Sequence, residues 1–307
     1  MFKNKEGKIR SGWKIAALSA VMLGTITIVS VLISIIPVIQ LVSSGDYNPM
    51  TMEFSVQGKR VMDQINTVML FLQEIIIILT TIIAWRFIIK RQLGNMGLPS
   101  FIKYSRDFFI GLLFGIVSMS IVFGAIVLSG NATVETWVPH FSSDTIIYLL
   151  LFILVGFAEE IYGRGFVMST LRQTGSLPAI IIISAVIFAV MHSGNSGISL
   201  LAYLNLFLVG LLFAYMFLKS GNIWMPIGFH ITWNYFQGNI FGFKVSGLNT
   251  SGIWTTVYDK NTILNGGDFG PEGGLFVTAI ILMGFLFVRW YYRNSHFSFL
   301  QNQGNPG

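Results

Sequence analysis

Residues 145–171 read TIIYLLLFILVGFAEEIYGRGFVMSTL, an apolar run interrupted by two acids and one cation. The run is long enough to cross a bilayer, which takes about 20 residues in a helix. Ionisable groups within such a run are costly and usually mark function rather than packing. The segment therefore predicts a membrane helix that carries part of a functional polar site.

The composition of the whole chain agrees with a membrane protein. The 307 residues are 53% hydrophobic and 10% charged, whereas soluble domains carry roughly 25% charged residues. There is no Cys, which excludes disulfides, thiolate nucleophiles and Cys-ligated zinc. The net charge of +6 is interpreted as loop charge that orients helices, so no nucleic-acid partner is expected.

Apolar runs predict about eight transmembrane segments. Backbone groups in hydrocarbon must be satisfied within the segment, so the segments are predicted as helices and the fold as all-α and polytopic. The seventh run and the fifth are short or polar. The predicted spans lie at about 15–42, 65–89, 108–128, 145–171, 177–192, 200–218, 223–241 and 274–292.

The distribution of cations predicts the orientation. With eight spans and both termini in the cytoplasm, most of the 19 Lys and Arg residues face inward, and only Lys59, Arg60, Lys244 and Lys260 face outward. The positive-inside rule favours this topology, hence a multi-pass cell-membrane protein. Three regions follow: N-terminal helices 1–3 in 1–144, a core of helices 4–7 in 145–241, and an outer loop, last helix and cytoplasmic tail in 242–307.

The polar groups of the fourth span differ in their surroundings. Glu160 and Arg164 are four residues apart, so they share a helix face and are expected to pair. Glu159 points elsewhere and has no local cation. A buried carboxylate without a cation is a plausible general base near neutral pH.

Two further spans carry imidazoles at the same spacing. Phe188 and His192 share a face of the fifth span, so the ring is expected to pack on the imidazole. His230 and Asn234 share a face of the seventh span. Counted by helix rise, Glu159 lies about 18 Å, His230 about 10 Å and His192 roughly 22 Å from the inner ends of their spans. This difference in level argues against their meeting unless the fifth span is tilted.

Glu-Glu-x-x-x-Arg, Phe-x-x-x-His and His-x-x-x-Asn occur in that order across successive spans. This arrangement resembles the CPBP family, which includes the type II CAAX prenyl endopeptidases and the Abi bacteriocin-processing or immunity proteins. The resemblance covers about residues 145–241. It implies an eight-helix intramembrane endopeptidase with a cavity open to the cytoplasm and the bilayer, acting on a membrane-associated peptide or protein.

The resemblance also implies roles for the motif residues. Glu159 would activate a water that attacks the scissile carbonyl, and His192 would help to hold that water. His230 and Asn234 would polarise the carbonyl and stabilise the oxyanion. Glu160 and Arg164 would brace the site, although Glu160 could share the role of base.

Two questions stay open at this point. Glu159, His192 and His230 are acceptable zinc ligands, so a metalloprotease is an alternative, but the compact His-Glu-x-x-His signature is absent and a cofactor-free site is favoured. The alternative functions are a non-catalytic immunity or scaffold protein and a secondary transporter. The transporter is disfavoured because the sequence has no inverted repeat.

Overall fold

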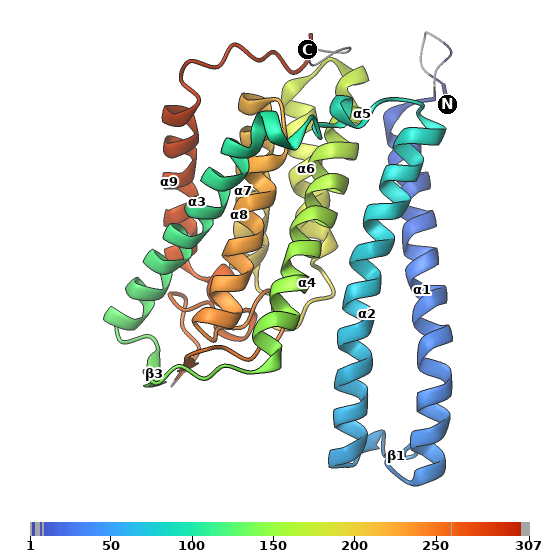
Figure 1. Cartoon of the computed structure of the whole chain (residues 1–307), viewed down its shortest axis with the longest axis vertical. Coiled ribbons are helices and arrows are strands. Elements are labelled where there is room, and N and C mark those ends of the chain that lie inside the picture. Colours follow the sequence, from blue (N-terminus) through green and yellow to red (C-terminus); the bar gives the residue numbers. More distant parts are fainter. Residues whose placement is uncertain (1, 4–6, 8, 259, 302–307) are drawn as a thin grey trace. The chain divides into compact units, whose positions relative to one another are not determined.

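The computed structural model describes residues 2–3, 7, 9–258 and 260–301. Helices dominate the described residues and the strands are short (Figure 1), so the predicted all-α polytopic membrane fold is confirmed. The chain divides into two compact units, Met1–Ala84 and Trp85–Gly307. The predicted sidedness and the division at 144 and 241 stay predictions, and both chain ends, Met1 and 302–307, lie outside the described residues.

The first unit is a helical hairpin. A glycine ends its first helix, and a serine caps the start of its second. Gly45 follows the first helix with φ 79°, a left-handed conformation that glycine adopts without strain. Ser55 caps the second helix by accepting a hydrogen bond from the Gly58 amide at 3.0 Å. The elements are α1 (Ser11–Ser44), β1 (Tyr47–Asn48), β2 (Glu53–Phe54) and α2 (Val56–Ile83).

The second unit holds all the predicted site residues. Following a π-helix at Ala84–Ile88 and a 3₁₀ turn at Leu93–Met96, its main elements are α3 (Phe101–Leu128), β3 (Thr133–Thr136), α4 (Ser143–Glu160), α5 (Ser169–Leu171), α6 (Leu177–Met191), α7 (Leu200–Ser220), α8 (Trp224–Tyr235), β4 (Thr255–Val257) and α9 (Leu275–Tyr291). Strands β3 and β4 pair antiparallel and join the loops after α3 and α8.

Within the described residues, five helices are long and apolar enough to cross a membrane. They match the first four predicted spans and the sixth. The fifth and eighth predicted spans form shorter apolar helices, Leu177–Met191 and Leu275–Tyr291. The seventh forms α8 and a π-helix at Phe236–Ile240. The predicted total of eight spans therefore stays a prediction.

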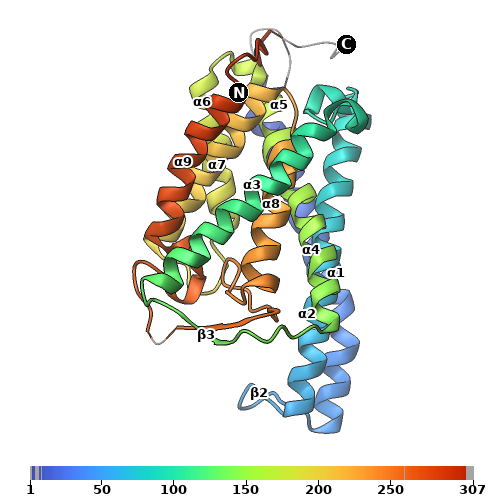
Figure 2. The same ribbon diagram turned by 60° about the vertical axis from the view of Figure 1, so that its left-hand side comes forward.

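Helix α8 lies at the centre of the second unit. Every residue from Trp224 to Asn234 is buried, and α3, α4 and α7 pack around the helix. Figure 2 shows α3 running obliquely across α8. A helix enclosed in this way needs no lipid-facing apolar surface, so it can carry polar side chains such as His230, Thr232 and Asn234.

Glycines let the backbones approach closely around α8. A Cβ at Gly111 of α3 would lie 2.3 Å from the Met225 carbonyl oxygen, and one at Gly115 would lie 2.2 Å from the Thr232 hydroxyl. The Thr232 hydroxyl donates across the same interface to the Leu112 carbonyl at 2.8 Å. Small residues with interhelical hydrogen bonds are the usual means of holding membrane helices together.

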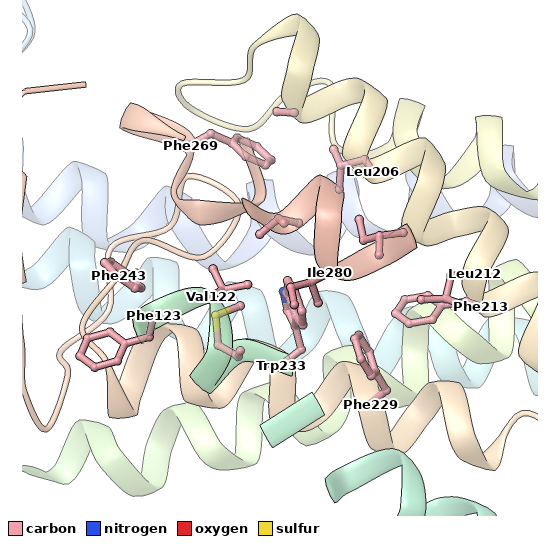
Figure 3. Close-up of a cluster of buried hydrophobic side chains, with 14 of the residues drawn as sticks. Val122, Phe123, Leu206, Leu212, Phe213, Phe229, Trp233, Phe243, Phe269 and Ile280 are labelled. Atoms are coloured by element: carbon pink, nitrogen blue, oxygen red, sulfur yellow. The ribbon is translucent and has the colours of Figure 1, made fainter. Parts of the chain in front are cut away.

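A cluster of aromatic and aliphatic side chains completes the packing. Phe213 of α7, Phe229 and Trp233 of α8 and Val122 of α3 are among its buried members (Figure 3). Asn205 connects α7 to α9 and the residues before it. Its amide N–H group donates to the carbonyls of Glu272 and Gly274, and its amide oxygen accepts from the Thr278 hydroxyl of α9.

Substituting Gly115 by Ala tests the close contact between α3 and α8. Because the added methyl group would overlap the Thr232 hydroxyl and the Phe229 carbonyl, we expect a loss of about 1–3 kcal/mol in the free energy of unfolding. Thermal unfolding in detergent measures it. Gly124→Ala is the matched control, since Gly124 lies on the same helix with no atom within 4 Å of the added Cβ. An equal effect of the two substitutions would contradict the proposed role of Gly115.

Candidate active site

The two adjacent acids stand at the end of α4, where the helix changes type. Residues 145–171 were expected to form one regular helix. Instead α4 ends at Glu160, and Ile161–Met168 form a π-helix in which every residue is buried. The Ser184 hydroxyl of α6 donates to the Gly163 carbonyl at 2.9 Å, which satisfies a backbone group of the irregular segment. π-Helical segments within α-helices are frequent at functional sites.

Glu160 forms the predicted pair with Arg164 and also contacts an imidazole. Its Oε1 lies 3.1 Å from Arg164 Nη1 and 3.2 Å from His230 Nδ1. The side chains of Glu160 and Arg164 are fully buried. One carboxylate thus joins a cation of the π-helix to an imidazole of α8, which keeps the three charged or ionisable groups from being unpaired in the interior.

Aromatic rings surround the guanidinium. The centroids of the Phe188 and Phe213 rings lie 4.3 Å and 4.8 Å from Arg164 Cζ, close enough for cation–π attraction. The Phe213 ring also stacks on the His230 imidazole, at 5.4 Å and 29°. Phe213 was missed in the sequence because it is one of several aromatic residues in the largely apolar run of α7, and no spacing distinguishes it from lipid-facing rings.

The imidazole of His192 is held by the backbone as well as by Phe188. Its ring lies 4.9 Å from the Phe188 ring, as expected from the shared face. Its Nδ1 is 2.8 Å from the Phe188 carbonyl oxygen. A carbonyl only accepts hydrogen bonds, so Nδ1 carries the proton and a neutral ring presents an unprotonated Nε2.

Glu159 faces Nε2 of this ring. Its Oε2 lies 4.0 Å from His192 Nε2, and both side chains are partly accessible, unlike Glu160. Oε2 is itself buried and has no hydrogen-bond partner among the described residues. The carboxylate and the imidazole lie close together even though residue counting placed Glu159 and His192 at different heights in the membrane. Counting residues along one helix does not determine the distance between side chains on two different helices.

Asn234 lies one turn beyond His230 on α8 and is buried. Its side-chain amide makes no hydrogen bond to any residue that the structure describes, so both its donor and its acceptor remain available. The structure thus joins Glu159 with His192, and Glu160 with Arg164 and His230, and places Asn234 on the same helix as His230.

The zinc alternative requires three ligands around one point. Within 2–3, 7, 9–258 and 260–301, no group of three or more His, Asp or Glu side chains is arranged to hold a metal ion. His230 Nδ1 is already directed at Glu160. Glu159, His192 and His230 as placed do not fit a three-ligand zinc site, and the use or absence of a cofactor stays a prediction.

Comparison with known families matches the region that carries these residues. Residues 141–236 match the family model described as type II CAAX prenyl endopeptidase Rce1-like. The predicted resemblance over 145–241 is confirmed, and the chain is a multi-pass membrane protein with a protease-family region. No curated protein and no solved structure matches the chain. All the motif residues, from Glu159 to Asn234, lie within the Rce1-like region.

Arg164→Met tests the buried charge contact in the Rce1-like region. The substitution leaves Glu160 without its cation in a site that water does not reach, so we expect a loss of about 3–5 kcal/mol in unfolding free energy. Glu160→Gln combined with Arg164→Met should recover part of that loss. Thermal unfolding of the single and double variants in detergent provides the measurement.

Lys244→Met is the matched control, because Lys244 pairs with Asp268 at 3.4 Å on the exposed surface. Exposed ion pairs contribute under about 1 kcal/mol. If Arg164→Met were no more destabilising than Lys244→Met, the buried contact would have no structural role.

Proposed function

We propose that this protein is an intramembrane endopeptidase that hydrolyses a peptide bond of a membrane-associated peptide or protein, using a water activated by Glu159. Membership of residues 141–236 in a protease family supports hydrolysis. The five long apolar helices among the described residues support a reaction within a bilayer. The chemical assignment rests on how Glu159 and His192 face each other.

The observation that carries the proposal is the 4.0 Å gap between Glu159 Oε2 and His192 Nε2. With the His192 proton on Nδ1, both facing atoms are hydrogen-bond acceptors. A gap of this size between polar groups suits a bridging water. A water that donates one O–H to each acceptor would direct its lone pairs outward, in the orientation that a nucleophile requires.

The reaction then follows from the proton positions. The water oxygen attacks the scissile carbonyl carbon while Glu159 takes the water proton. A tetrahedral intermediate with a negative oxygen forms. When the C–N bond breaks, Glu159 returns the proton to the leaving nitrogen, which gives a carboxylic acid and an amine. The acid then passes its remaining proton to the amine, so the products are a carboxylate and an ammonium group. Glu159 therefore acts first as general base and then as general acid.

His230 and Asn234 are the proposed donors to the oxyanion. The contact of His230 Nδ1 with the Glu160 carboxylate at 3.2 Å fixes the ring, and the imidazolium form of His230 would donate to the oxyanion from Nε2. The Asn234 amide is the second donor, one turn away. Donors held in advance at the position of developing charge are often the largest single contribution to catalysis.

Glu159→Gln tests the role of the base, since it keeps the side-chain volume and removes the proton acceptor. We expect the cleavage rate to fall by about 10²–10⁴ while the protein inserts and unfolds as the wild type does. Peptides released from membranes of cells carrying each form can be compared by mass spectrometry of new N-termini, a measurement that works whatever the substrate is.

Glu135→Gln is the matched control, because Glu135 is an exposed acid of β3 and should leave the peptide profile unchanged. New N-termini that persist in Glu159→Gln would refute the assignment. If all variants and the wild type gave the same peptides as cells lacking the protein, the scaffold or immunity alternative would replace the protease.

Metal dependence provides a separate test of the proposed chemistry. Because Glu159 and His192 can position the water between them, we expect cleavage by the purified protein to survive a strong chelator. Elemental analysis should show less than one zinc per chain. Activity that is lost on chelation and restored by zinc would instead favour the metalloprotease alternative.

A further inference from the structure

A groove lies between α3 and α9, on the outside of the second unit. Its volume is about 910 Å³, within the roughly 300–1,000 Å³ of small-molecule sites. Leu113, Val117 and Ile121 of α3 line it together with Met283 and Phe287 of α9. The proposed catalytic residues lie on other elements, and none of them lines the groove, so it is separate from the candidate active site.

The greater part of the groove is apolar. Leu113, Val117, Ile121 and Met283 line the groove and are exposed by 55%, 46%, 49% and 55%. The helical backbones on both walls are hydrogen-bonded internally. This part can therefore recognise hydrocarbon but offers nothing to a peptide backbone, which would need partners for its amides and carbonyls.

The polar groups gather at one end. Arg106, near the start of α3, lies with its Cζ 5.8 Å from the centroid of the Tyr291 ring, and Arg293 lies 5.4 Å from that of Trp290. Both arginines are exposed and line the groove. The acid at this end, Asp107, accepts a hydrogen bond from the Asn222 amide at 2.7 Å. Two guanidinium groups against one already bonded carboxylate favour an anion.

The length of the groove also suits a lipid. Arg106 and Ile121 are separated along α3 by roughly 22 Å, at 1.5 Å per residue. One leaflet contributes about 15 Å, half of the hydrocarbon thickness of the bilayer. The groove can therefore take one full acyl chain with its glycerol and phosphate at the arginine end, while the aromatic residues there match the belt that membrane proteins place at the interface.

We infer that the groove between α3 and α9 binds an anionic glycerophospholipid, with its phosphate against Arg106 and Arg293 and an acyl chain along Leu113, Val117 and Met283. Charge and shape both select this occupant: two arginines against one acid at one end favour an anion, and the mainly apolar walls favour a hydrocarbon chain. The site is independent of the proposed peptidase reaction.

Native mass spectrometry of the full chain tests the inference. The protein is released from bilayers containing equal amounts of phosphatidylglycerol and phosphatidylcholine with identical acyl chains. We expect phosphatidylglycerol to be retained over phosphatidylcholine by roughly tenfold or more, since each basic side chain near a membrane surface contributes about a factor of five for anionic lipid. The double variant Arg106→Gln/Arg293→Gln should lose that preference.

Lys103→Gln/Arg289→Gln is the matched control, because it removes the same charge from α3 and α9 at exposed residues that do not line the groove. It should retain the preference. Val117→Trp should fill the groove and reduce retention of both lipids, and Met283→Trp serves the same purpose from the opposite wall if Val117→Trp fails to fold.

Three results would overturn the inference. They are equal retention of the two lipids by the wild type, a preference that survives in Arg106→Gln/Arg293→Gln, and a dimer in which the groove is covered by a second copy without lipid. Glu159→Gln should bind phosphatidylglycerol as the wild type does, so loss of peptidase activity and loss of lipid binding are read out separately.

Discussion

The arrangement of the second unit depends on one buried carboxylate. Glu160 contacts Arg164 from within its own chain segment and His230 from α8, and neither Glu160 nor Arg164 reaches solvent. A buried charge is tolerated only when it has partners. Removing one partner lowers the stability of the fold more than replacing the whole pair with apolar residues does. The contact therefore links the π-helix after α4 to the central helix and determines which way the His230 ring faces.

The surrounding side chains and helices hold Glu160, Arg164 and His230 in this arrangement. Phe188 and Phe213 enclose the Arg164 guanidinium, so the cation is held by rings where no water is available. Glycines on α3 bring α8 within backbone distance, and a serine of α6 satisfies a carbonyl of the π-helix. Because Glu160 Oε1 contacts both Arg164 and His230, Glu159 is the acid left to face His192. Two adjacent acids thus have different surroundings, one fully buried and one partly accessible.

Much of the fold and some of the side-chain contacts could be predicted from the spacing of residues in the sequence. The apolar runs predicted the all-α membrane fold, and spacing of four residues correctly paired Glu160 with Arg164 and Phe188 with His192. The three motifs together predicted the Rce1-like family. The helix type after Glu160 was not predicted, because a π-helix depends on what packs against it. Phe213 was not predicted either, because its role exists only where α7 meets the π-helix Ile161–Met168 and α8. The lengths of the fifth, seventh and eighth apolar segments could not distinguish a full span from a shorter helix.

Composition and periodicity alone established that this chain folds as membrane helices and that acids, imidazoles and an amide are placed within them, since each rule involved acts over a few neighbouring residues. Which groups meet was determined by the packing of helices distant in the chain. The 4.0 Å approach of Glu159 to His192 and the shared contact of Glu160 with Arg164 and His230 depend on helix tilt and on glycine contacts between helices. These are relations between separate segments, and residue spacing within any one segment carries no information about them.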